Sequence, residues 1–229
     1  MSEIIILKNH FKTLIVYIFR IFKNYFKMIF FKDINSFYIP NLFIKNVVMI
    51  NPNKIKYINS IPMKFYKSTQ FIMDFDWDKK NKYVEKFKKN NHEFITCNEL
   101  INGLPVKKCQ SYFYIKKKIS KLQKYNNLKN ENEIISFLSN KVELCESIKK
   151  NGLKRKFNRN IQFLIDRNLN LVKINSGAHR FAISRILKLK KIPIEIKLIH
   201  LKCFRKHSKQ VVNVKIINKI IKDVVKKYA

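Results

Sequence analysis

The spacing of hydrophobic positions is most regular in the second half of the chain. Between residues 131 and 150, apolar side chains recur at mostly three- and four-residue steps, which predicts one long amphipathic helix. Asn151 and Gly152 follow it, as expected for the C-terminal end of a helix. The apolar positions of this helix are Ile134, Ile135, Leu138, Val142, Cys145 and Ile148.

The chain then changes from helical to strand-like patterning. Residues 160–165 and 171–174 are short apolar runs on either side of a polar turn, which predicts a hairpin. A helix is expected to open at Ser176 and to run to about residue 188. A further strand is predicted at residues 192–199 and a closing helix at residues 211–225.

The first half of the chain has a weaker pattern. Residues 46–50 and 54–58 are predicted to be short strands, residues 79–90 a charged surface helix, and residues 91–130 a mixture of short helix and loop. A basic run in the last of these segments is interpreted as a solvated face. It consists of Lys116, Lys117, Lys118, Lys121 and Lys124.

Residues 4–31 form a separate basic and amphipathic segment. The longest uncharged run there has seven residues, whereas a membrane-spanning helix needs roughly 20. Its lysines gather on one side of the predicted helix, opposite a broad aliphatic and aromatic face. Two readings stay open: docking on an anionic membrane surface, or packing on the protein's own domain.

Composition narrows the class of protein. The 229 residues carry a formal net charge of +34, and 46% of them are hydrophobic, which excludes a wholly disordered chain. Lys, Asn, Ile, Phe and Tyr are abundant together, as in AT-rich coding, so part of the charge reflects codon bias. The charge alone predicts nonspecific binding of polyanions at low salt. Four cysteines without a metal-binding spacing indicate reduced, mostly buried thiols in a cytoplasmic protein.

The strongest candidate for chemistry is the predicted helix start at residues 176–180. Amides in the first turn of a helix have no intrahelical partners and, together with the helix dipole, favour an anion. Arg180 adds a planar fork suited to phosphate oxygens, and His179 adds a donor that titrates near neutral pH. These features predict a phosphate-binding site made of Ser176, Gly177, Ala178, His179 and Arg180.

The order of these elements resembles the ParB/sulfiredoxin superfamily. The resemblance rests on residues 144–148 (LCESI), Asn151-Gly152, the hairpin, residues 176–182 (SGAHRFA) and residues 191–194 (KIPI). It implies an α+β fold with a core of helix, hairpin, helix and strand, and with helical additions at both ends. Ser176 stands where the family has an aspartate. Residues 71–78 (FIMDFDWD) also resemble the GDWD motif of a ParB-like subgroup, with Phe75 in the place of its glycine.

The resemblance implies binding of a nucleoside triphosphate, ATP or CTP with Mg²⁺, at the helix start. Some members hydrolyse CTP, and others transfer phosphate from ATP to serine, so an NTP-dependent hydrolase or kinase is the enzymatic expectation. Ala178 occupies the place of sulfiredoxin's reactive cysteine, which argues against that chemistry. The domains expected are a basic helix at 1–32, an α/β extension at 45–130, the core at 131–205 and a C-terminal helix at 208–229.

Other candidates are weaker, and no catalytic residue is assigned. Asp74, Asp76 and Asp78 alternate, so in a strand they would share one face and could hold Mg²⁺. If Trp77 is buried, the alternative is that these acids face solvent or pair with lysines. Glu146 is either a catalytic acid or a solvated one, and His200 and His207 are candidate anion ligands.

The alternative function is a nucleic-acid-binding protein or nuclease that uses the basic surface. A third is peripheral contact with the inner membrane face through residues 4–31.

Overall fold

The computed structural model describes most of the chain from residue 36 onward. The described residues are 36–38, 44, 46–59, 70–74, 76–88, 91–122, 125, 127–154, 160–207 and 214–229. The amphipathic segment at residues 4–31 lies outside them. None of the helices in this described part combines the length and apolarity that crossing a membrane requires.

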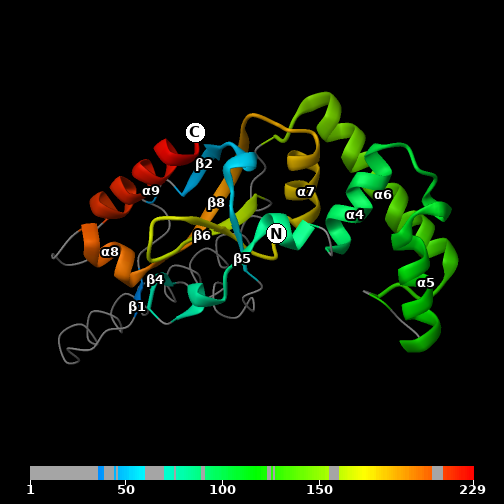
Figure 1. Ribbon diagram of the computed structural model, residues 1–229, viewed down its shortest axis with the longest axis horizontal. Helices are drawn as coiled ribbons and strands as arrows, with labels where there is room; N and C mark the ends of the chain where they lie inside the picture. Colours follow the sequence, from blue (N-terminus) through cyan, green and yellow to red (C-terminus); the bar gives the residue numbers. More distant parts are fainter. Residues whose placement is uncertain are drawn as a thin grey trace, which may run out of the picture.

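The described part of the chain begins with short strands, continues through a run of helices, and ends with strands and helices intermixed (Figure 1). The strands are β1 (Ser36–Tyr38), β2 (Val47–Ile50), β3 (Tyr57–Ile58), β4 (Gln70–Met73), β5 (Lys82–Tyr83), β6 (Ile161–Ile165), β7 (Leu171–Lys173) and β8 (Ile192–His200). The α-helices are α3 (Val84–Lys88), α4 (His92–Ile101), α5 (Gln110–Leu122), α6 (Glu131–Asn151), α7 (Ala178–Ile186), α8 (Leu201–His207) and α9 (Val214–Tyr228). Short 3-10 helices are η2 (Pro52–Lys54), η3 (Trp77–Lys80) and η4 (Val106–Lys108).

Strand β8 is the centre of one mixed sheet. Strand β6 pairs with it in parallel along one edge, while β2 (antiparallel) and β4 (parallel) pair with its first and last residues along the other edge. The sheet continues from β6 through β7 and β3 to β5, and from β4 to β1. The prediction of an α+β fold is confirmed, because the sheet mixes parallel and antiparallel neighbours and helices pack against it.

The main core lies on one face of this sheet. Ile161, Phe163 and Ile165 of β6 alternate with residues of the opposite face and pack in one cluster with α7 and α9. The other face carries a small cluster of Met73, Leu164, Ile174 and Leu198, against which Trp77 packs. The larger buried surface therefore fixes α7 on the sheet.

Three further helices extend away from the sheet beyond α7. Helix α4 packs on α7, α6 packs on α4, and α5 packs on α6, at the right-hand end of Figure 1. A separate cluster joins α5 to α6 through Tyr112, Ile115, Ile134 and Leu138. Helices α8 and α9 lie at the opposite end of the molecule (Figure 1).

The predicted order of helix, strand, strand, helix and strand over residues 131–200 is confirmed, and Arg180 lies in the first turn of α7. The closing helix is also confirmed, as α9. The single helix predicted for residues 79–90 is wrong: η3, β5 and α3 follow one another there. Residues 91–130 hold two full helices, α4 and α5, where short helix and loop were expected. The four predicted domain boundaries stay predictions, although β2, β3 and β4 share the sheet of β6–β8.

The acidic segment holds the hairpin between β6 and β7 in place. It lies in a turn and in η3, so the strand interpretation of Asp76 and Asp78 is wrong. Asp78 is buried and accepts hydrogen bonds from the Nε, Nη2 and backbone N–H of Arg167, at 2.7, 2.6 and 3.1 Å. Asp76 accepts a bond of 2.7 Å from the same guanidinium. Lysine pairing was the alternative foreseen, and Lys79 does pair with Asp76 at 2.8 Å.

His200 completes this ion-pair group from the end of β8. Its Nδ1 accepts the backbone N–H of Lys202 at 3.0 Å, so a proton on Nε2 faces Asp78 Oδ1 at 3.5 Å. The His200 ring is fully buried and lies 5.6 Å from the ring of Trp77. These contacts give His200 a structural role in place of the expected anion ligand.

Asp78→Asn is expected to destabilise the fold by about 2–3 kcal/mol, because it removes a buried carboxylate that three Arg167 donors satisfy. Burial raises the pKa of Asp78, but the Arg167 hydrogen bonds outweigh it and lower the pKa below the ordinary 3.8. The contribution is therefore present above the unfolded-state pKa and is lost as the pH falls below it. Urea unfolding at neutral and acidic pH measures both effects. Exposed Asp76→Asn is the control, and an equal loss in both variants would contradict the burial argument.

Candidate functional site

The turn between β7 and α7 depends on one glycine. Gly177 has φ +75°, in the left-handed region that disfavours residues with a Cβ. A Cβ at this position would lie 3.1 Å from Ile161 Cα and 3.2 Å from Ile161 Cγ1. The turn therefore needs glycine both for its backbone conformation and for its close approach to β6.

Gly177 also occupies the position that precedes helix α7. The first helical hydrogen bond runs from the Phe181 N–H to the Gly177 carbonyl, at 3.0 Å. The amides of Ala178 and His179 come before it, at the positive end of the helix. The helix was expected to open at Ser176; it begins at Ala178, Gly177 holds the capping position, and no side-chain cap is formed.

Arg180 lies beside this turn. Its Nη2 is 3.2 Å from the position that a Cβ on Gly177 would take, so the guanidinium folds back over the helix start. The side chain is half-buried. The structure thus brings together Gly177, the first-turn amides and Arg180, as the sequence predicted.

A lysine that the sequence reasoning missed lies directly under the turn. Lys173, the last residue of β7, is almost fully buried, and its Nζ donates to the carbonyls of Ser176, at 2.7 Å, and Ile174. The Nζ is also 5.8 Å from the centre of the Phe181 ring. Burial, followed by the charge of Arg180, lowers the pKa of Lys173 to about 7. The one available signal was a lysine inside the apolar run of residues 171–174.

His179 does not play the titrating role that its sequence position suggested. Burial, followed by the charge of Lys141 on α6, lowers the pKa of His179 to about 4. The imidazole is therefore neutral at pH 7. Its backbone carbonyl lies 3.8 Å from the Sγ of Cys97 on α4. His179 fixes the helix start between α4 and α6 and adds no positive charge.

The site is electropositive. Lys173, Arg180 and Lys141 bring positive charge to it, and Glu93 on α4 is the acid that acts on both Lys173 and His179. Lys173 is buried and Arg180 is half-buried beside it, so each positive charge raises the free energy of the other, and an anion beside them lowers it.

The remaining sequence candidates lie elsewhere. Glu146 is an exposed residue of α6. His207 is half-buried in α8, with Nδ1 2.9 Å from the Cys203 carbonyl oxygen. No group of three or more metal-ligating side chains occurs within the described residues. All four cysteines are buried and free of disulfide bonds, as the composition indicated.

Comparison with known proteins found no similar protein. No family model, no curated protein and no solved structure matches the chain. The site is therefore interpreted from its own geometry.

Gly177→Ala tests the turn, with Gly103→Ala as its matched control. Both glycines have a positive φ, +75° and +79°, but an added Cβ meets nothing within 4 Å at Gly103. Gly103→Ala is expected to cost about 1 kcal/mol from backbone strain. Gly177→Ala is expected to cost at least about 1 kcal/mol more, because the Cβ also meets the β6 backbone. Chemical denaturation compares the two, and equal losses would show that the approach to Ile161 has no energetic role.

Proposed function

We propose that the protein binds the triphosphate of a nucleotide at the start of α7. The proposal rests on one observation. Arg180 lies at the helix start that presents the first-turn amides of Ala178 and His179, above the buried Lys173. Amides at a helix start recognise phosphate oxygens, and a guanidinium adds charge-assisted hydrogen bonds. The binding residues are Ser176, Gly177, Ala178, His179 and Arg180, with Lys173 beneath them.

The nucleotide proposed is ATP or CTP with Mg²⁺. Mg²⁺ in such sites commonly binds phosphate oxygens, waters and only one or two protein carboxylates. The proposal therefore does not require a set of protein ligands that surrounds the metal, because Mg²⁺ would bind together with the triphosphate. We place this function in the cytoplasm, where thiols stay reduced.

The family proposed is the ParB/sulfiredoxin superfamily. Its support is the succession α6, β6, β7, α7 and β8, which has the order expected from the resemblance, with SGAHR at the start of α7. Hydrolysis of the nucleotide, or transfer of its phosphate as in a kinase, is the enzymatic extension of the proposal. No catalytic residue is assigned for this hydrolysis or transfer.

Arg180→Ala is expected to weaken nucleotide binding roughly 10- to 150-fold, because it removes a charge-assisted contact. Affinity for duplex DNA is expected to change little, since one of 49 basic residues is lost. Both affinities are measured at one fixed salt concentration by calorimetry and fluorescence anisotropy. Arg205→Ala, at an exposed arginine of α8, is the matched control and keeps wild-type nucleotide affinity.

Two outcomes contradict this function. The first is a wild-type protein that binds no nucleotide with or without Mg²⁺. The second is a DNA affinity that Arg180→Ala cuts about tenfold while Arg205→Ala leaves it unchanged. The second outcome would make the α7 start a nucleic-acid site and favour the alternative function.

Lys173 predicts a proton uptake on nucleotide binding. A phosphate near the buried ammonium stabilises its charged form, so the bound state should raise the pKa of Lys173 above about 7. Affinity should then fall as the pH rises from 7 toward 9. Titrations at pH 8 in two buffers of different ionisation enthalpy measure the uptake. Lys173→Met should abolish it, and uptake that survives this substitution would assign the proton to another group.

A further inference from the structure

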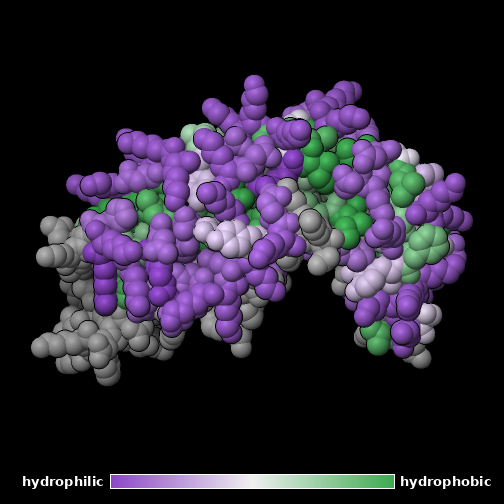
Figure 2. Space-filling model, viewed as in Figure 1, coloured by the Kyte–Doolittle hydropathy of each residue, from purple (hydrophilic) through white to green (hydrophobic). Residues whose placement is uncertain are grey.

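Helix α5 has an exposed face that carries two aromatic rings and three lysines. Phe113, Lys117 and Lys121 follow one another at four-residue steps, and Tyr114 and Lys118 lie beside them on the helix. The residues Phe113 and Tyr114 are 58% and 42% exposed. This end of the molecule mixes hydrophilic, pale and hydrophobic residues in Figure 2, whereas hydrophilic residues cover most of the remaining described surface in that view.

The lysines of this face are available to a partner. Lys107 and Lys116, at its margin, pair with Glu131, at 3.8 and 3.1 Å. No carboxylate among the described residues forms an ion pair with Lys117, Lys118 or Lys121. The face therefore presents uncompensated positive charge, which is complementary to a chain of anionic groups.

Both rings of this face have aromatic neighbours. Phe113 lies edge-on to Tyr112, with 5.5 Å between ring centres, and Tyr114 lies 4.3 Å from the ring of His92. The Nζ of Lys118 is 5.7 Å from the centre of the Tyr114 ring. Tyr114, which also lies 5.9 Å from the ring of Tyr125, is the more constrained of the two rings, and a constrained ring loses less conformational entropy when a base stacks on it.

We propose that this face of α5 binds single-stranded nucleic acid. Bases would stack on Phe113 and Tyr114, while Lys117, Lys118 and Lys121 contact the backbone phosphates, the combination that single-strand-binding surfaces use. An anionic membrane fits less well. A helix at a membrane surface needs a broad apolar face, and the apolar residues Tyr112 and Ile115 are already buried against α6.

This surface is separate from the proposed nucleotide site. Helices α4 and α6 lie between α5 and the start of α7, as Figure 1 shows. Substitutions of Phe113, Lys117 and Lys121 should therefore leave nucleotide affinity unchanged, whereas Tyr114 contacts His92, which acts on His179, and is not used in the test. The two proposals succeed or fail independently.

The test of stacking uses the full chain and a fluorescent thymidine oligonucleotide. Phe113→Ala is expected to weaken binding roughly 5- to 150-fold, as for loss of one stacked base. Phe113→Tyr keeps a ring and should keep most of the affinity. Phe113 is exposed, so neither change should unfold the protein, and circular dichroism checks this.

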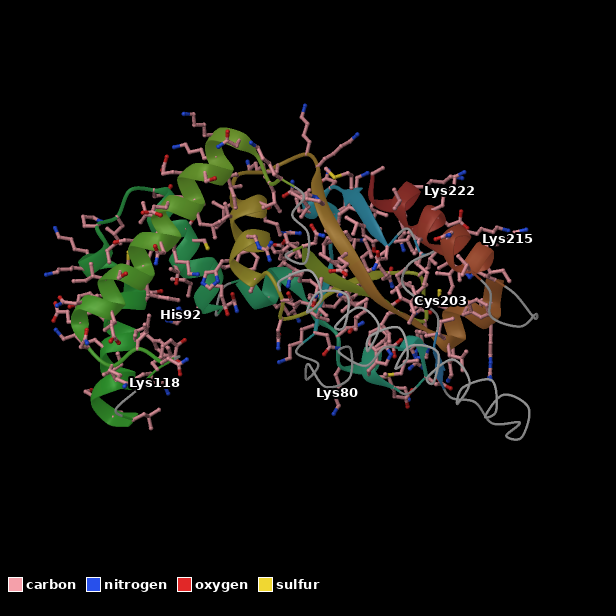
Figure 3. All side chains as sticks on the ribbon, turned by 180° about the vertical axis from the view of Figure 1, so that it is seen from behind. Lys80, His92, Lys118, Cys203, Lys215 and Lys222 are labelled. Atoms are coloured by element: carbon pink, nitrogen blue, oxygen red, sulfur yellow. The ribbon has the colours of Figure 1, made fainter. Side chains whose placement is uncertain are left out.

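The test of the charges compares two double variants of equal net charge. Lys117→Gln with Lys121→Gln should weaken binding and reduce the salt slope, the change of log affinity with log salt, by about 1.4. Lys215→Gln with Lys222→Gln, on α9 at the far end of the molecule, should change it little. Figure 3 labels Lys215 and Lys222 on α9, and Lys118 on α5 at the opposite end.

Three results would overturn the proposal. One is a wild-type protein that does not bind the oligonucleotide. Another is an equal loss in the two lysine variants together with no effect of Phe113→Ala, which would indicate diffuse attraction to the whole surface. The last is Phe113-dependent binding to phosphatidylserine vesicles without Phe113-dependent binding to the oligonucleotide, which would make α5 a membrane contact.

Discussion

The close approach of the Gly177 turn to the backbone of β6 and the burial of α7 in the main core together hold this helix on the sheet. A residue with a Cβ would push the turn away from Ile161. Helix α7 carries Phe181, Ala182 and Ile183 into the main core, and α4 packs on its outer side. Helices α6 and α5 pack on α4 and on each other, and α6 also contacts α7, so the helical end is joined to the sheet through α7.

The Gly177 turn places two basic side chains, Lys173 and Arg180, in different electrostatic environments next to each other. Lys173 is held by backbone carbonyls with little water, while Arg180 lies half-buried above it. Backbone carbonyls satisfy the hydrogen bonds of an ammonium but neutralise its charge only in part. On the other face of the sheet, the charge of Arg167 is neutralised, because its guanidinium pairs with the carboxylates of Asp76 and Asp78. Arg167 is neutralised by carboxylates, whereas the ammonium of Lys173 has only backbone carbonyls as partners in the described hydrogen bonds. This difference distinguishes the start of α7 from a purely structural ion pair.

The sequence predicted what local patterning controls. The periodicity of α6, the polar turn before Leu171 and the glycine before α7 each constrain a few neighbouring residues, and each was correct. The contacts of Asp78 with Arg167 and His200 join segments far apart in the chain, so the alternation of acids could not decide between a shared strand face and pairing with other side chains. The neutral state of His179 likewise depends on burial beneath other helices, which no local pattern records.

The first half of the chain was harder to predict for a related reason. Short strands such as β3 and β5, with two residues each, have too few positions to show alternation. They exist because β7 and α3 lie beside them. Helices α4 and α5 were underestimated, because their buried positions pack against α6 and α7 and not against a single sheet face.

Strand β2 pairs with β8 across most of the chain's length, with Asn46 and Ile196 separated by 150 positions. Arg185 adds bonds from α7 to the carbonyls of Pro52 and Ile55, and to Glu85. During synthesis, the early strands therefore leave the ribosome long before their pairing partners exist. The apolar strand β2 must wait unpaired, so the nascent chain is exposed to aggregation or to chaperones until nearly the last residues are made.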